Sequence, residues 1–128
     1  MKSKQVFVKV FIVFTALSGC FSVLFGAWLA HAGQHINEID KVRLITAHQY
    51  QVIHTLALLV VSLAYRHSQL RTLCISAILF IVGIILFSGS LYLKTYTGML
   101  SLGGFAPLGG ITLALGWLSL AFLGKEKS

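Results

Sequence analysis

Polar side chains that could bind a ligand or transfer a proton lie where an apolar helix is expected to begin. Within residues 46–65, TAHQYQVIHTLALLVVSLAY, the residues Tyr50, Gln51 and His54 precede an almost uninterrupted apolar run. On a helix they share one face, with Tyr50 one turn before His54. A phenol, an amide and an imidazole inside a membrane can line a solute path, bind a ligand or join neighbouring helices by hydrogen bonds.

The rest of the sequence offers partners for this polar face. The apolar run is too short to cross a bilayer, so the helix must begin near Leu44 and carry the polar residues to membrane depth. Facing lipid, they would lack hydrogen-bond partners, and we therefore expect them to face other helices. The predicted intramembrane polar cluster comprises Tyr50, Gln51, His54, Ser88, Ser90 and His31, and Tyr92 and His35 are further candidate partners. Both a set of helix-locking hydrogen bonds and a functional polar cavity are compatible with it.

Metal binding has less support than either interpretation. His31 and His35 are four residues apart, a spacing that can place two histidines on one helix face. Together with His48 or His54 they could bind zinc or copper, and two histidines facing each other across helices could bind haem. No cysteine or carboxylate clearly joins them, so we expect no metal and no cofactor.

Catalytic groups are also scarce. The acidic residues are Glu38, Asp40 and Glu126, and all lie at the edges of the apolar segments. General acid–base catalysis needs a group positioned beside the reacting atoms, and no serine or cysteine nucleophile is obviously paired with His54. We therefore predict that the protein is not an enzyme.

The elements that position these residues are membrane-spanning helices. Of the 128 residues, 57% are hydrophobic and only 10% are charged, whereas about 25% are charged in an average soluble protein. The mean hydropathy is +0.89. Each apolar segment approaches or exceeds the roughly 20 residues that cross a bilayer. The predicted spans are Val6–Ala30, Leu44–Tyr65, Leu73–Leu93 and Phe105–Leu123. We expect an all-α, four-helix membrane bundle with short loops, forming a single domain over residues 1–128.

The net charge of +7 indicates membrane topology rather than nucleic-acid binding, because the basic residues flank the spans instead of sharing one face. One side of the membrane would receive Lys2, Lys4, Lys9, Arg66, Arg71, Lys125 and Lys127, and the other Lys41, Arg43 and Lys94. Since lysine and arginine are retained in the cytoplasm, both termini are predicted to be cytoplasmic.

Small residues recur at helical spacing in three spans and predict close helix packing. The expected packing positions are Ser18, Ser22 and Gly26 in the first span, Gly83 in the third and Gly110 in the fourth. The first stripe overlaps LSGC, a sequence that resembles a lipoprotein cleavage box ending at Cys20. Because the apolar run continues past Cys20, we expect this cysteine to lie, unprocessed, inside the first helix.

The connection between the first two spans carries a helix-start signal. Asn37 precedes Glu38 and Asp40, which places a capping residue before two first-turn acids. We expect a short interfacial helix here that runs into the second span.

Several stretches resemble one family of small bacterial inner-membrane proteins, the YgdD/YwdK-like proteins, a domain of unknown function. The similar stretches are GAWLAH, TAHQYQVIHTLALL, FSGSLY and APLGG followed by GW. They cover most of the chain, although Trp28 and Leu29 depart from the family pattern. The resemblance implies four membrane helices in the bacterial inner (plasma) membrane and no established activity.

These observations favour a non-enzymatic membrane protein that interacts with or supports other envelope components. The alternative is an oligomeric transporter or channel subunit for a small solute, with a metal or haem carrier less favoured. The expected partners are the lipid bilayer, with self-association or other membrane proteins as open alternatives, and no nucleic acid.

Overall fold

The protein is a bundle of long helices, seen in a computed structural model that describes residues 2–125 apart from the side chains of Gln34 and Leu100. The main helices are α1 (Lys2–His31), α2 (Glu38–Ser68), α3 (Arg71–Ile84), α4 (Ser90–Thr97) and α5 (Phe105–Ser119). A π-helical turn, Ile85–Gly89, joins α3 to α4 without a break in the rod. Short 3-10 segments precede α2, precede α5 and follow α5.

Four helical rods are long and apolar enough to cross a membrane. They cover Lys2–His31, Glu38–Ser68, Arg71–Thr97 and Ser101–Gly124. Each contains one of the spans predicted from hydropathy in full, so the predicted four-helix membrane bundle is confirmed. Cys20 lies inside α1, where its side chain is exposed.

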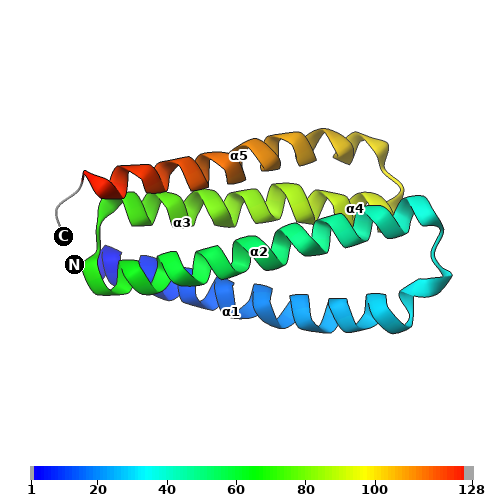
Figure 1. Ribbon diagram of the computed structural model, residues 1–128, viewed down its shortest axis with the longest axis horizontal. Coiled ribbons are helices and arrows are strands. Elements are labelled where there is room, and N and C mark those ends of the chain that lie inside the picture. Colours follow the sequence, from blue (N-terminus) through cyan, green and yellow to red (C-terminus); the bar gives the residue numbers. More distant parts are fainter. Residues whose placement is uncertain (1, 126–128) are drawn as a thin grey trace.

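The rods lie roughly antiparallel, with α1 and α5 on opposite sides of the bundle and α2 and α3 between them (Figure 1). The main packing pairs are α1 with α2, α2 with α3, and α3 with α5. The apolar core gathers where α2 and α3 meet and includes Leu58, Ala77 and Phe80, none of which has an exposed surface. Both outer helices consequently keep wide faces toward lipid.

The start of α2 follows the capping signal in the sequence. The Asn37 side chain accepts a hydrogen bond of 2.8 Å from the backbone amide of Asp40, which satisfies one of the free amides of the first turn. The expected interfacial segment forms the first turns of α2 and continues into the span as one helix.

Glycines allow α5 to approach α3 closely. A Cβ at Gly83 would come 2.5 Å from the Leu113 side chain, and a Cβ at Gly109 would come 2.3 Å from the backbone nitrogen of Phe87. The predicted packing position Gly110 is different, because its Cβ would lie at an ordinary 3.8 Å from the Phe87 ring. The closest approach is therefore at Gly109, one residue before the predicted position.

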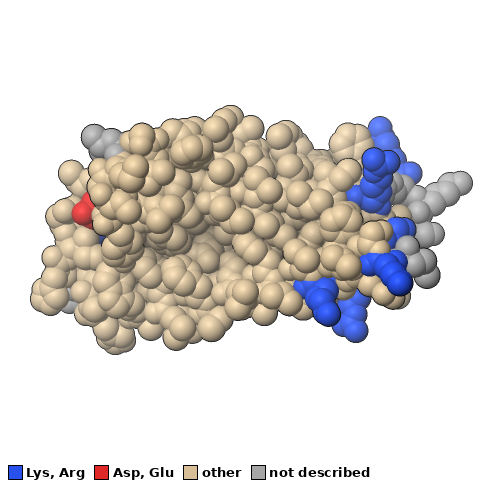
Figure 2. Space-filling view, turned by 180° about the vertical axis from the view of Figure 1, so that it is seen from behind, with Lys and Arg blue, Asp and Glu red and all other residues tan. Residues whose placement is uncertain are grey.

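Basic side chains gather at one end of the bundle (Figure 2). We call this the basic end; its described members are Lys2, Lys4, Lys9, Arg66, Arg71 and Lys125. Lys127 and Glu126 lie outside the described residues. Glu38 and Asp40 lie at the opposite end, where Asp40 pairs with Arg43 at 2.9 Å.

Candidate functional site

Gln51 is the centre of a polar network that joins three helices near the middle of the bundle. Its side-chain nitrogen donates to the Ser18 hydroxyl of α1 at 3.0 Å. Its side-chain oxygen accepts a hydrogen bond of 2.7 Å from the Tyr92 hydroxyl of α4. The amide therefore uses both of its ends, and its orientation follows from its two partners.

The network continues through hydroxyl groups along the α1–α2 contact. The hydroxyls of Ser18 and Thr55 share a hydrogen bond of 2.8 Å, and the Ser22 hydroxyl donates to the Ser18 carbonyl at 2.8 Å. The groups are buried. We call Ser18, Gln51, Thr55 and Tyr92 the Gln51 network. Since its members bond to one another, the network satisfies its own polar groups and attaches α1 and α4 to α2.

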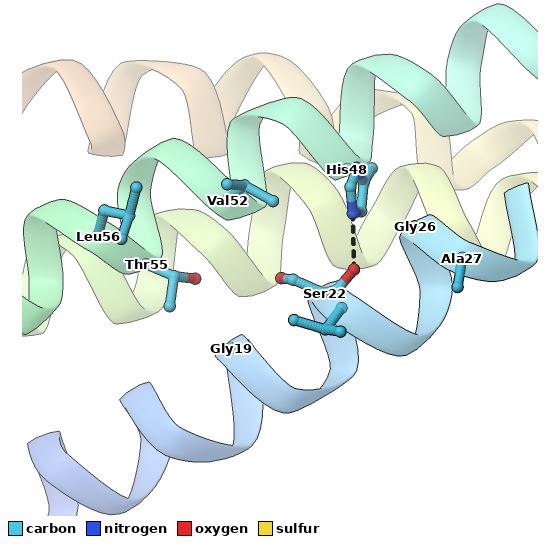
Figure 3. A pocket seen from close by; sticks show the side chains of 9 residues that line it. Gly19, Ser22, Gly26, Ala27, His48, Val52, Thr55 and Leu56 are labelled. Carbon is cyan, nitrogen blue, oxygen red and sulfur yellow. Dashed lines mark hydrogen bonds between the residues drawn. The ribbon is translucent and has the colours of Figure 1, made fainter. Parts of the chain in front are cut away.

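Two further contacts reinforce this attachment. The Ser88 hydroxyl, in the π-helical turn, donates to the Ala47 carbonyl of α2 at 2.7 Å. His48 of α2 points toward α1, where its Nε2 lies 2.8 Å from the Ser22 carbonyl (Figure 3). A carbonyl can only accept, so Nε2 carries the proton and donates. A Cβ at Gly26 would lie 3.0 Å from this nitrogen, so the predicted packing glycine makes room for the histidine ring.

His54 differs from the prediction that it bonds to another helix. Its Nδ1 donates to the Tyr50 carbonyl of its own helix at 2.7 Å. The ring is buried among aromatic side chains, with centroids 6.0 Å from Phe80 of α3 and 5.9 Å from Trp117 of α5. The difference has a simple cause, because the carbonyl one turn back can be reached by a histidine side chain of the same helix.

The other members of the predicted cluster are not brought together. Tyr50 is 42% exposed and stacks on Phe87 at a centroid distance of 4.3 Å, so it does not face the interior as expected. The Ser90 hydroxyl donates to the Phe87 carbonyl of its own rod. His31 is exposed at the end of α1, far along the helix from Ser18. Of the predicted cluster, Gln51 and Ser88 alone make the side-chain hydrogen bonds that join described helices.

Sequence reasoning missed Thr55 and treated Ser18 only as a packing residue. A signal was available, because Thr55 follows Gln51 by four residues and so shares its helix face. Tyr92 of the FSGSLY stretch was among the candidate partners of the polar face, and its hydroxyl does reach the Gln51 amide.

Two grooves flank α1 along the bundle. The first, of about 410 Å³, lies between α1 and α2 and is shown in Figure 3. It is lined by Gly19, Ser22, Val23, Gly26, Ala27, His48, Val52, Thr55 and Leu56. The second, of about 340 Å³, lies between α1 and the α3–α4 rod, with Gln51 and Ser88 on its floor. Both are almost entirely apolar at their surface, which suits hydrocarbon or another helix better than a polar solute.

The described residues contain no group of three or more histidine, cysteine, aspartate or glutamate side chains that could hold a metal ion. His31 ends α1, whereas His35 ends the separate 3-10 turn Gly33–His35, so the two do not share one α-helical face. The arrangement near the centre of the bundle is a closed set of neutral hydrogen bonds. Such a set can fix helices to one another.

Comparison with known proteins agrees with this architecture. Residues 25–110 match the family described as "Protein of unknown function (DUF423)". The chain is 39% identical over 120 residues to a UPF0382 membrane protein of Haemophilus influenzae. The aligned region covers 92% of this chain and 94% of the relative. It is 36% identical over 115 residues to the UPF0382 membrane protein YwdK of Bacillus subtilis (88% and 93% covered).

A third relative is named for its location. The UPF0382 inner membrane protein YgdD of Escherichia coli is 30% identical over 107 residues, with 83% of this chain and 82% of the relative covered. No solved structure matches the chain. With a family match over most of its length and full-length relatives that are named membrane proteins, the chain belongs to the DUF423 family of multi-pass membrane proteins.

Proposed function

We propose that the protein is a non-enzymatic membrane protein that binds a transmembrane helix of another membrane protein along α1. The observation that carries the proposal is Gly19. Apart from its chain neighbours and the nearby backbone of its own helix, no described atom lies within 4 Å of the place where its Cβ would be, although it sits in the middle of a helix and lines the first groove. Glycine costs about 1 kcal/mol relative to alanine inside a helix, and no contact among residues 2–125 requires it at this position.

The surroundings of Gly19 support the same interpretation. α1 buries only a narrow stripe, Phe11, Thr15, Ser18 and Ser22, against the rest of the bundle. Beside the groove, Val23 is 73% exposed and Ala27 is exposed. Small residues on a lipid-facing helix let a second backbone approach closely, and the resulting van der Waals packing is one of the forces that associate helices in membranes.

The Gln51 network favours an interaction role over a transport role. A solute path needs polar groups that can be offered to the solute, whereas Gln51, Ser18 and Tyr92 already bond to one another. The network holds α1 at a fixed position, so the face with Gly19 is presented as a rigid surface.

Affinity purification in mild detergent tests this proposal. The wild-type protein is compared with Gly19→Leu, which fills the groove, and with Ala114→Leu, which adds similar bulk to an exposed position of α5. We expect one membrane protein to be recovered with the wild type and Ala114→Leu and to be lost with Gly19→Leu. Equal recovery with all three variants, at equal thermal stability, contradicts a partner site at Gly19.

We also propose that both termini are cytoplasmic, because Lys2 and Lys125, the first and last described residues, both belong to the basic end. A reporter that is active only in the cytoplasm should work when fused to the C-terminus. Activity of a periplasmic reporter at the same position would reverse the orientation without affecting the helix-binding proposal.

A further inference from the structure

A third apolar groove lies on the side of the bundle away from α1, between α3 and the end of α5. It has a volume of about 600 Å³ and is lined by Leu79, Leu115, Leu118, Ser119, Ala121 and Phe122. Its one polar side chain is already occupied, because the Ser119 hydroxyl bonds with Ser76 and donates to the Gly116 carbonyl. The groove therefore offers a hydrocarbon surface.

Two cations stand at the end of this groove. Arg71 begins α3 eight residues before Leu79, a distance of about 12 Å along the helix axis. Lys125 follows Phe122 by three residues, and the segment Leu120–Gly124 packs against α3. Both side chains are exposed, and neither contacts an acidic side chain within residues 2–125. The groove and the cations together have the polarity of a membrane lipid, with an apolar part leading into a charged part.

We propose that this corner binds an anionic phospholipid, with an acyl chain in the α3–α5 groove and the phosphate between Arg71 and Lys125. The charge favours an anionic headgroup, since Arg71 and Lys125 have no acidic partner among residues 2–125 and therefore attract negative charge and repel the choline of a zwitterionic lipid. The depth favours a lipid over free phosphate, because the apolar groove continues from the cations toward the middle of the span. The N-terminal end of α3 adds its partial positive charge at the same place.

The site does not depend on the proposed helix partner, because it lies on α3 and α5 rather than α1. Native mass spectrometry of the full-length protein in detergent tests it. The protein is titrated with phosphatidylglycerol or with phosphatidylcholine of identical acyl chains. We expect one phosphatidylglycerol to be retained with clear preference over phosphatidylcholine. Equal retention of the two lipids overturns the proposal.

Charge-neutral variants locate the site. Arg71→Gln with Lys125→Gln should weaken phosphatidylglycerol binding by roughly 30-fold, at about fivefold for each charge removed near an anionic headgroup. Lys4→Gln with Lys9→Gln removes two charges at the same end, from α1, and should leave the retained lipid in place. Equal weakening by both pairs would assign the effect to general surface charge and overturn the site.

Two more measurements separate the groove from the cations. Leu118→Trp fills the groove without changing charge, and it should reduce phosphatidylglycerol retention while the melting temperature of the lipid-free protein stays unchanged. Inorganic phosphate, added in excess over the lipid, should not displace it. Displacement by phosphate, or full retention in Leu118→Trp, shows that the groove holds no acyl chain and overturns the proposal.

Discussion

Gly109→Ala should destabilise the bundle far more than the same change at its neighbour, Gly110. A Cβ at Gly109 would lie 2.3 Å from the Phe87 backbone nitrogen, whereas ordinary contact begins at about 3.4 Å. The difference of about 1.1 Å must be met by moving α5 away from α3, because the obstacle is backbone and cannot rotate aside. That shift would also separate Leu113 from Gly83, with which it packs.

The magnitude follows from two opposing effects. Overpacking a well-packed contact costs about 1–3 kcal/mol, and a backbone obstacle places Gly109→Ala at the upper end. Alanine also gains up to about 1 kcal/mol of helix propensity over glycine, so we expect a net loss of about 2 kcal/mol. At Gly110 the new methyl group would lie 3.8 Å from the Phe87 ring, so the propensity gain should leave this variant as stable as the wild type or slightly more stable.

The assay is reversible unfolding in detergent micelles, followed by helix content, with both variants measured beside the wild type. Because the propensity gain is common to the two, the difference between them, about 3 kcal/mol, reports the packing cost alone. If Gly109→Ala matched Gly110→Ala within about 0.5 kcal/mol, the description of the α3–α5 contact would be wrong.

Three further substitutions examine the polar and aromatic contacts in the same unfolding assay. Gln51→Leu should lower the free energy of unfolding by about 1–2 kcal/mol because it removes hydrogen bonds to two helices, while Gln49→Leu, at an exposed position, should leave it unchanged. Equal losses in the two variants would contradict the central role of Gln51 in the network. Tyr92→Phe should cost about 0.6 kcal/mol and add almost nothing in the Gln51→Leu background, whereas full additivity would mean that the two side chains are not bonded. The stability of His54→Phe should stay within about 0.5 kcal/mol of the wild type because the ring contacts persist, while His54→Ala should lose about 2 kcal/mol or more. A large loss of stability in His54→Phe would favour the original prediction that His54 bonds to another helix.

The spans and the start of α2 could be predicted because each depends on local sequence. Hydropathy alone identifies helices that must hydrogen-bond internally in lipid. Asn37 followed by two acids encodes its own cap. Gln51 was predicted to face the bundle interior because a polar side chain at that membrane depth finds no hydrogen-bond partner in lipid, and in the structure it is buried.

The partners of the polar residues could be predicted only in part: Tyr92 and Ser88 bond to α2 as expected, but other polar residues bond within their own helix. Serine, threonine and histidine in a helix can bond to the carbonyl three or four residues back. His54 and Ser90 do so, while Ser88 reaches across to α2. Periodicity does not distinguish these outcomes.

The packing glycine of α5 shows a second limit. Gly109 and Gly110 are adjacent in the sequence, yet one residue rotates a helix face by about 100°. The spacing of small residues in the fourth span favoured Gly110. The face that packs on α3 is instead set by Gly109, Leu113 and Gly116, the buried residues of α5.

Site-specific photo-crosslinking in intact membranes tests the proposed helix-binding face most directly. A photoreactive residue is placed at Val23, beside Gly19, and in a matched protein at Ile111, which is 60% exposed on α5. We expect a discrete protein adduct from Val23 that disappears in Gly19→Leu, and lipid adducts alone from Ile111. Lipid adducts alone from both positions, or a Val23 adduct that persists in Gly19→Leu, would contradict the account.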